Sequence, residues 1–267
     1  MIDGIEVDAK AGATIRSAAE TVGIEIPTLC WARNLNPANA CRLCVVEVEG
    51  TRPLVASCSR TVEDQMVITT NSARVRENRR SVLELLASAV ELDWAESELV
   101  AHFVEYEARS DHFDGTKLEE ASKIHDDLFA REYSRCVLCY RCVDACGDQA
   151  QHTFAIAIAG RGFESRVSTE FDVRLPDSAC VYCGNCIAVC PTGALTPLTE
   201  FVMRTESTWV QERQVVTHTV CAFCGVGCNL ELHVQDDNIV KVTSPSDHDI
   251  SLGNLCIKGR FGWQHLD

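Results

Sequence analysis

The stretches CVLCYRCVDAC (residues 136–146) and CVYCGNCIAVCP (residues 180–191) repeat one cysteine pattern within the chain. Both read C-V-x-C-x-x-C-x-x-x-C, and 44 positions separate Cys136 from Cys180. Three closely spaced thiolates can cap one face of an iron–sulfur cubane, while a remote fourth thiolate reaches further. The repeat therefore predicts two 4Fe–4S clusters in the middle of the chain.

The repeat resembles the C-x2-C-x2-C-x3-C run of bacterial ferredoxins, in which the fourth cysteine of each run ligates the other cluster. The resemblance implies two crossed ligand sets, namely Cys136, Cys139, Cys142 and Cys190 for one cluster, and Cys180, Cys183, Cys186 and Cys146 for the other. Between the copies, Phe154, Ile156 and Ile158 alternate with small residues, which predicts a strand pair with a structural role.

The chain has 16 cysteines among 267 residues, which indicates either disulfides in a secreted protein or metal ligands in a reducing compartment. The start, MIDGIEVDAK, lacks a basic segment followed by an apolar one. The longest apolar run, FAIAIAG (154–160), is too short to span a bilayer. These features predict a cytoplasmic chain without a membrane span, and they favour metal ligands over disulfides.

The net charge of −15 argues against nucleic acid or an anionic membrane as a partner. Thiolate-bound clusters would make the charge more negative still. Two interpretations stay open: a partner with a basic docking patch, or an acidic surface that only confers solubility.

A further set, Cys30, Cys41, Cys44 and Cys58, has the spacing C-x10-C-x2-C-x13-C. The residues around it predict a short hairpin over 2–7, a helix over 14–22 capped by Thr14 and ended by Gly23, and strands in LCVVEVEG (43–50) and QMVITTN (65–71). A small sheet, one crossing helix and a cysteine-bearing loop form a β-grasp arrangement.

This segment resembles the N-terminal 2Fe–2S domain shared by the large iron–sulfur subunit of respiratory complex I, NAD-linked formate dehydrogenases and some hydrogenases. The resemblance implies that Cys30, Cys41, Cys44 and Cys58 hold a 2Fe–2S cluster. A structural zinc site is the alternative, although zinc sites favour two tight C-x2-C pairs and only Cys41 and Cys44 form one.

The last set, Cys221, Cys224, Cys228 and Cys256, has the spacing C-x2-C-x3-C-x27-C, with predicted strands in LELHV (230–234) and NIVKV (238–242). With the motif CIKGRFG (256–262), it resembles the N-terminal 4Fe–4S domain of molybdopterin oxidoreductases, and most closely the formate dehydrogenase branch. The resemblance implies a third 4Fe–4S cluster, with Lys258 on the electron path between that cluster and a pterin. An ordinary solvated lysine is the alternative.

The region from about residue 72 to residue 132 contains no cysteine. Val82, Leu85, Leu86 and Ala89 recur at helical spacing, which predicts a helix. The family often places a cluster held by one histidine and three cysteines in this region. His102, His112 and His125 have no cysteines beside them, so we expect that cluster to be absent and these histidines to be surface or helix-packing residues.

The predicted organisation is α+β in four parts: a β-grasp 2Fe–2S domain (1–78), a helical linker (79–130), a two-cluster 4Fe–4S ferredoxin-like domain (131–205) and a small 4Fe–4S hairpin domain (214–267). No G-x-G-x-x-G motif links a strand to a helix, and no catalytic residue set is evident. The chain is therefore not expected to be catalytic alone.

The resemblance implies an electron-relay subunit, with molybdopterin (Mo or W) and FMN or NAD carried only by partner chains. Its partners would be a molybdopterin-containing catalytic chain of the formate dehydrogenase type and a flavin/NAD-reducing or other iron–sulfur chain. A relay in a hydrogenase or electron-bifurcating complex is the first alternative. An iron–sulfur redox sensor is the second, and four full cysteine sets without a basic recognition helix argue against it.

Metal analysis of the natively purified protein tests the cluster reading. One 2Fe–2S and three 4Fe–4S clusters would contain about 14 irons per chain and give cysteine-ligated cluster EPR signals on reduction. Zinc in place of iron would contradict the whole interpretation.

Overall fold

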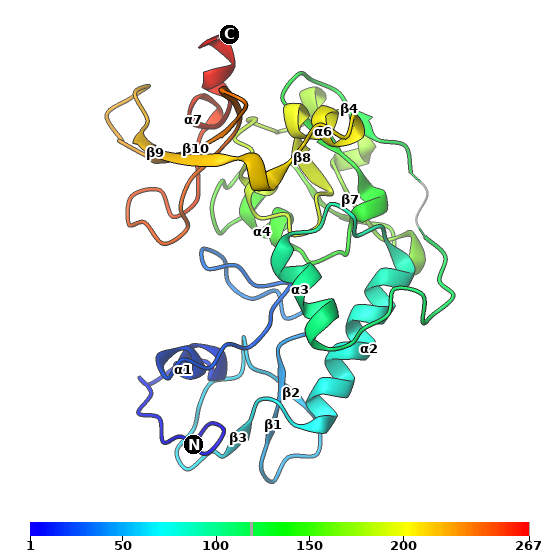
Figure 1. The fold of residues 1–267 in the computed structure, drawn as a ribbon, viewed down its shortest axis with the longest axis vertical. Helices are drawn as coiled ribbons and strands as arrows, with labels where there is room; N and C mark the ends of the chain where they lie inside the picture. Colours follow the sequence, from blue (N-terminus) through cyan, green and yellow to red (C-terminus); the bar gives the residue numbers. More distant parts are fainter. Residues whose placement is uncertain (118–119, 267) are drawn as a thin grey trace. The chain divides into compact units, whose positions relative to one another are not determined.

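The structure, a computed structural model, describes residues 1–117 and 120–266 and divides into two compact units. The first unit holds Met1–Trp31 and Pro37–Leu118, and the second holds Ala32–Asn36 and Glu119–Asp267. In both units, short strands and helices are joined by long loops (Figure 1). Within the described residues, no helix is both long enough and apolar enough to cross a bilayer.

The first unit is built on a small antiparallel sheet. Its elements are α1 (Ile15–Thr21), β1 (Val45–Val48), β2 (Val55–Ala56), β3 (Ile68–Thr69), α2 (Ala73–Ala89) and α3 (Ser97–Glu105). The strand order is β2-β1-β3, with Val45 opposite Ala56 and Glu47 opposite Thr69. One buried cluster joins α1 to this sheet and also contains Cys44 and Cys58, so the hydrophobic core and the cysteine loop are continuous.

The predicted helix over 14–22 is confirmed as α1. The Thr14 hydroxyl oxygen accepts a hydrogen bond from the Ser17 amide at 3.1 Å, which satisfies a donor that the first turn leaves free. Gly23 follows the helix with φ +75°, a conformation that glycine adopts without strain. The predicted strands near 43–50 and 65–71 are confirmed as β1 and β3.

The hairpin predicted over residues 2–7 is reduced to a single bridge between Ile2 and Ile5. Asp3 and Gly4 form the tight turn, with φ of 48° and 82°. The Asp3 carboxylate accepts a hydrogen bond from the Thr70 amide at 2.7 Å, and Ile2 forms a parallel bridge with Ile68. The N-terminal segment is therefore held by β3 and its following residue.

Helix α2 confirms the predicted helix, but it packs through a different face from the one that the apolar spacing indicates. The buried side carries Val75, Arg79, Leu83 and Ala87, whereas Leu85 is 54% exposed. Arg79 is 2% exposed and reaches Val45 of β1, the strand beside α2 in Figure 1. Hydrophobic periodicity misses this face because a charged residue lies at its centre.

The guanidinium of Arg79 has three neutral acceptors. It donates to the carbonyl oxygens of Leu43 at 3.2 Å and Val45 at 3.0 Å, and to the Tyr106 hydroxyl at 3.0 Å. These hydrogen bonds offset the cost of burying the charge, because each donor keeps a partner. Arg79 thereby attaches α2 to the backbone on both sides of Cys44.

The second unit contains three small antiparallel sheets and several short helices. Its strands are β4 (Lys123–Ile124), β5 (Phe129–Arg131), β6 (Ala157–Ala159), β7 (Arg166–Ser168), β8 (Leu195–Pro197), β9 (Val215–Val220), β10 (Asn229–Gln235) and β11 (Asn238–Thr243). Its α-helices are α4 (Arg141–Cys146), α5 (Asn185–Ala188), α6 (Leu198–Thr205) and α7 (Ile257–Phe261). Its 3-10 helices are η1 (Tyr133–Arg135), η2 (Gly162–Glu164), η3 (Glu170–Asp172), η4 (Leu175–Asp177), η5 (Gln211–Arg213) and η6 (Gly262–Leu266).

The sheets of the second unit confirm two predictions and add one strand. The strand pair predicted between the cysteine repeats is β6–β7, with Ile158 opposite Val167. The strands predicted in 230–234 and 238–242 are β10 and β11. Strand β9 was not predicted and completes the order β11-β10-β9. Every residue of β9 is exposed, so it lacks the apolar alternation that identifies a half-buried strand.

Replacing Arg79 with leucine should destabilise the first unit by about 3 kcal/mol or more, because the two carbonyls and the Tyr106 hydroxyl lose their buried donor. The free energy of unfolding in urea, followed by circular dichroism, measures this change. Arg80→Leu on the same helix is the matched control, because Arg80 pairs with Glu77 at the surface. An equal loss in both variants would contradict the role of Arg79.

Candidate metal centres

The structure brings Cys30, Cys41, Cys44 and Cys58 together in the first unit, with three of them buried and Cys41 half-buried. Cys30 and Cys41 are in hydrogen-bonding contact with each other, and so are Cys44 and Cys58. The Cys30 sulfur also accepts from the amides of Ala40 at 3.3 Å and Cys41 at 3.4 Å. The four sulfur atoms are thus arranged as two close pairs.

The pairing changes the acidity of the thiols. The contact with Cys58 lowers the pKa of Cys44 to about 7. The contact with Cys30, followed by burial, raises the pKa of Cys41, and the contact with Cys44 raises the pKa of Cys58. Each iron of a 2Fe–2S cluster takes two thiolates, whereas each iron of a cubane takes one. Two close pairs therefore fit a 2Fe–2S cluster better than a cubane.

In the second unit, two separate cavities are lined by cysteines. The first cavity is lined by Cys136, Cys139, Cys142 and Cys190 with mostly apolar neighbours. The second cavity is lined by Cys146, Cys180, Cys183 and Cys186, again with mostly apolar neighbours. Cys190 of the second repeat thus lies with the first three cysteines of the first repeat. Cys146 of the first repeat lies with the first three cysteines of the second repeat.

Burial dominates the acidity of the thiols around these cavities. It raises the pKa of Cys136 to about 11 and that of Cys139 to about 12, and it raises the pKa of Cys142 and Cys186 well above the usual value. Without a positive group these thiols stay neutral at pH 7. Iron would supply the positive charge that a buried thiolate lacks, so this donor set fits an iron–sulfur cluster.

Hydrogen bonds reach the sulfur atoms of the second cavity. The Tyr182 amide donates to the Cys180 sulfur at 3.4 Å, and the Thr153 hydroxyl lies 3.4 Å from the Cys146 sulfur. Donors aimed at ligand sulfur atoms stabilise their negative charge and so affect the reduction potential.

The fourth set lies on the β9–β10 loop and at the start of α7. Cys221 is buried, Cys228 is half-buried, and Cys224 and Cys256 are exposed. Burial raises the pKa of Cys228, and the neighbouring Cys221, Cys224 and Cys256 raise it further, so the four residues share one site. The Cys221 amide donates to the Cys228 carbonyl at 2.8 Å and closes the loop. This site is the most accessible of the four.

A single metal ion fits none of these sites. Among residues 1–117 and 120–266, no group of three or more His, Cys, Asp or Glu side chains has the geometry to hold one ion. Zinc needs its sulfur ligands about 2.3 Å from a common centre.

Lys258 lies in the first turn of α7, two residues after Cys256, and is exposed. The described part of the chain offers it no ion-pair partner. Its side chain is free to meet a group outside the described residues.

The histidines of the middle region contact acidic and polar residues. His102 lies 3.5 Å from Glu105 and 3.9 Å from Glu98 on α3, and His112 lies 3.9 Å from Glu84. His125 belongs to the second unit, where its Nδ1 accepts from the Leu175 amide at 3.3 Å. The expectation that these residues pack on helices or lie at the surface agrees with the contacts of His102 and His112.

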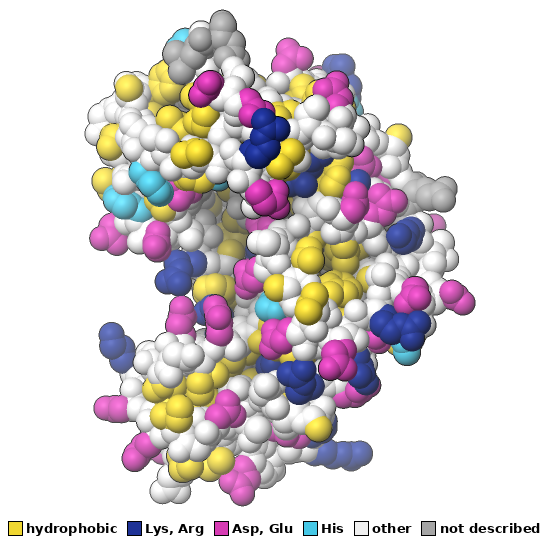
Figure 2. Space-filling model, viewed as in Figure 1, with side chains coloured by type: hydrophobic (Ala, Val, Ile, Leu, Met, Phe, Trp, Pro, Cys, Tyr) yellow, Lys and Arg dark blue, Asp and Glu magenta, His cyan; other side chains and the backbone are white. Residues whose placement is uncertain are grey.

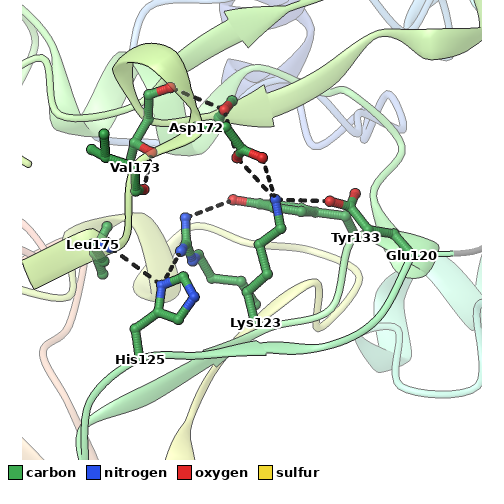
Figure 3. Close-up of polar contacts among 10 residues, drawn as sticks. Glu120, Lys123, His125, Tyr133, Asp172, Val173 and Leu175 are labelled. Atoms are coloured by element: carbon green, nitrogen blue, oxygen red, sulfur yellow. Dashed lines mark hydrogen bonds and ion pairs between the residues drawn. The ribbon is translucent and has the colours of Figure 1, made fainter. Parts of the chain in front are cut away.

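A polar network that the sequence does not reveal borders both cavities (Figure 3). Arg131, which lines the second cavity, donates to His125 Nδ1 at 2.9 Å and to the Tyr133 hydroxyl at 3.5 Å. Tyr133 lines the first cavity. Burial, followed by the charge of Arg131, lowers the pKa of His125, so the imidazole is neutral and accepts these hydrogen bonds.

Lys123 extends this network towards the surface. Its Nζ lies 2.8 Å from a Glu120 carboxylate oxygen and 2.9 Å from one of Asp172 (Figure 3). Strand β4, which carries Lys123, is thereby attached to the segment after β7. The network fixes β4, β5 and that segment around the two cavities.

The two copies of the cysteine repeat share an unusual backbone conformation. Tyr140 in the first copy and Gly184 in the second both have φ of +70°. Tyr140 is 39% exposed, whereas a Cβ at Gly184 would lie 2.3 Å from the Cδ of Arg260. Glycine is required in the second copy because Arg260 occupies the space. The difference between YR and GN in the two motifs is the sequence signal for this contact.

Comparison with known proteins identifies three domains along the chain. The 2Fe-2S iron-sulfur cluster binding domain matches residues 1–73, the 4Fe-4S dicluster domain matches 135–194, and the molybdopterin oxidoreductase Fe4S4 domain matches 214–267. The chain therefore contains 2Fe–2S and 4Fe–4S cluster domains in the predicted order.

Relatives include the alpha subunit of an NADPH-Fe(3+) oxidoreductase of Geobacter sulfurreducens, 33% identical over 100% of this chain and 31% of its own length. The NADP-reducing hydrogenase subunit HndD of Solidesulfovibrio fructosivorans is 40% identical over 73% of this chain and 35% of its own length. A candidate formate dehydrogenase of Staphylococcus haemolyticus (strain JCSC1435) is 24% identical over 100% of this chain and 31% of its own length. The chain thus spans about a third of these relatives.

Among solved structures, the crystal structure of an NAD+-reducing [NiFe]-hydrogenase in the H2-reduced state is similar, with a TM-score of 0.66 and 28% identity. The match covers 74% of this chain and 86% of that one.

Gly184→Ala should disturb the second cavity, since the new methyl group meets Arg260 in addition to the strain of a positive φ. Gly162→Ala is the control, because it has φ of +60° with nothing within 4 Å of the added Cβ. We expect Gly184→Ala to be less stable than the control by about 1–3 kcal/mol and to lose iron. Equal stability and iron content in urea titrations and metal analysis would contradict the packing argument.

Proposed function

The chain is homologous to the iron–sulfur region of these oxidoreductase subunits, and on that premise we propose that it relays single electrons between two partner sites through four clusters. One 2Fe–2S and three 4Fe–4S clusters form the path. The clusters supply the one-electron chemistry, and the protein holds, shields and tunes them. The chain itself carries out no bond-making step.

We propose that the ligand sets follow the four cysteine groups. The 2Fe–2S cluster takes Cys30, Cys41, Cys44 and Cys58, and the three 4Fe–4S clusters take Cys136, Cys139, Cys142 and Cys190; Cys180, Cys183, Cys186 and Cys146; and Cys221, Cys224, Cys228 and Cys256. The observation that carries this proposal is the pair of adjacent cavities in the second unit, each lined by four cysteines from two distant segments.

We also propose that the chain has four parts. A β-grasp 2Fe–2S domain over 1–78 is supported by the packing of α1 on the β2-β1-β3 sheet. The helical linker over 79–130, the two-cluster domain over 131–205 and the hairpin domain over 214–267 complete the proposed division. The expected location is the cytoplasm, where thiols stay reduced for cluster ligation.

The partners follow from the two ends of the relay. We propose a chain or domain with molybdopterin, holding Mo or W, at the accessible site of Cys224 and Cys256 beside Lys258, as in formate dehydrogenases. A flavin/NAD-reducing or other iron–sulfur partner would exchange electrons with the remaining clusters. On the face drawn in Figure 2, acidic side chains are scattered among basic ones and form no single acidic patch. The net charge of −15 would therefore attract a basic partner as a whole-protein effect.

A second candidate is a relay in a hydrogenase or electron-bifurcating complex. The similarity to the NADP-reducing hydrogenase subunit and to the NAD+-reducing hydrogenase structure favours it. The match of residues 214–267 to the molybdopterin oxidoreductase domain favours the first candidate.

Anaerobic purification from the native source, with identification of co-purifying chains, separates these candidates. A molybdenum- or tungsten-containing partner supports the formate dehydrogenase type, and a nickel–iron or iron-only hydrogenase chain supports the other. A reductive titration of the complex should show the clusters of this chain taking up about one electron each. A chain that holds no cluster and accepts no electrons would contradict the relay itself.

Lys258→Ala should leave the iron content unchanged and slow electron exchange with a molybdopterin partner by about tenfold, equivalent to ~1.4 kcal/mol of barrier. The reason is that Lys258 follows the ligand Cys256 and extends into solvent, where a partner group would meet it. Lys10→Ala, also exposed, is the matched control for the change in net charge. Stopped-flow reduction measures the rate, and an unchanged rate would make Lys258 an ordinary surface lysine.

A further inference from the structure

Arg260 is a buried charge whose hydrogen-bond acceptors are all neutral. It lies on α7, four residues after Cys256, and is 3% exposed. Within the described residues it forms no ion pair with an Asp or Glu side chain. A buried guanidinium without a carboxylate is costly unless another source of negative charge lies nearby.

The hydrogen bonds of Arg260 attach it to the ligand loop of the second cavity. Its Nε donates to the Cys183 carbonyl at 3.0 Å, and its Nη2 donates to the Asn185 side-chain oxygen at 3.2 Å. The same Asn185 oxygen accepts from the Leu255 amide at 2.9 Å, next to Cys256. The segment that carries the last cysteine of the fourth set is therefore held directly on the loop of the second cavity.

The aromatic neighbour of Arg260 reinforces this contact. Phe261 stacks on Phe129 with ring centroids 6.2 Å apart and an angle of 16° between the planes, and Phe129 lines the second cavity. Gly184 leaves room for both Arg260 and Phe261. Side chains from α7 thus pack against Phe129 and Gly184, two residues that line the second cavity.

Arg260 also lies between two sets of sulfur atoms. Its side chain binds the Cys183 carbonyl and its amide binds the Cys256 carbonyl, so Arg260 contacts one member of each set. A guanidinium stays protonated in proteins, so Arg260 places a positive charge next to Cys183 of the second cavity and Cys256 of the fourth set. The thiolates of bound clusters would compensate the buried positive charge of Arg260.

We propose that Arg260 is a positioning residue shared by two clusters, which raises the reduction potentials of both and couples their ligand loops for electron transfer. The inference rests on the proposed relay function. Reduction adds one negative charge to a cluster, and a fixed positive charge in a medium of low dielectric constant stabilises that form. Both clusters are then easier to reduce than they would be beside a neutral side chain.

The route between the two loops is short and continuous. The Cys183 carbonyl accepts from the Arg260 side chain, and the Arg260 amide donates to the Cys256 carbonyl at 3.0 Å. One electron leaves the cluster on one side, which is oxidised by one unit, and enters the cluster on the other, which is reduced by one unit. The exchange needs no proton and no further reactant.

Midpoint potentials of the purified, fully loaded protein, measured by redox titration with EPR detection, test this role. Arg260→Gln removes the charge, and we expect at least a tenfold shift towards the oxidised form at two of the clusters, which is 59 mV for a one-electron couple. The midpoint potentials of the other two clusters should not change. Arg260→Lys keeps the charge and should retain most of the potential.

Two further variants make the measurement specific. Arg213→Gln removes an exposed arginine that pairs with Asp236, and it should shift no potential. Asn185→Asp keeps the oxygen that accepts from Leu255 and Arg260 while adding a negative charge beside the guanidinium, so it should lower the same two potentials. It carries the test if Arg260→Gln loses iron.

Different results would contradict the role of Arg260 and the relay function. Fully loaded Arg260→Gln or Asn185→Asp protein with four unchanged potentials would overturn the role of Arg260 and leave the relay intact. If the midpoint potentials fell equally in Arg260→Lys and Arg260→Gln, the effect would come from packing, and the proposed role of the Arg260 charge would be wrong. A wild-type chain without clusters would instead overturn the proposed function.

Discussion

The proposed ligand sets bring sulfur atoms from separate parts of the chain together, and in the first unit and around both cavities of the second unit these sulfur atoms are largely buried. Burial raises the pKa of cysteines such as Cys142 and Cys186, so these sulfur atoms become ligands only where a positive group compensates the thiolate. Strands of two to seven residues and helices that mostly stay short surround the sites. In the first unit, Cys44 and Cys58 belong to the same buried cluster as the apolar residues of α1 and the sheet.

Buried arginines connect the cysteine loops to the rest of each unit. Arg79 holds the carbonyls of Leu43 and Val45 on either side of Cys44, and Arg260 holds the carbonyl of Cys183. In each case a planar fork of donors satisfies backbone acceptors beside a candidate ligand. Each side chain therefore fixes the backbone next to a candidate ligand.

Local signals in the sequence were sufficient for much of the secondary structure. Thr14 and Gly23 bracket α1 because caps depend on neighbouring residues only, and the alternation in LELHV and NIVKV identifies β10 and β11. The signals failed where tertiary contacts decide. The buried face of α2 is centred on Arg79, β9 has no apolar face, and Ile2 pairs with Ile68 more than sixty residues away.

The sequence by itself determined how many cysteine groups there are, how closely their members are spaced and where Lys258 lies after Cys256, because these features are written in the order of the residues. Only the tertiary structure decided that Phe129 and Arg131 line a cavity with Cys146 and Cys180, and that Arg260 reaches Asn185 across 75 positions. The physical reason is that a buried charge and a shared cavity depend on which distant segments exclude water together. A pattern along the chain cannot express that condition.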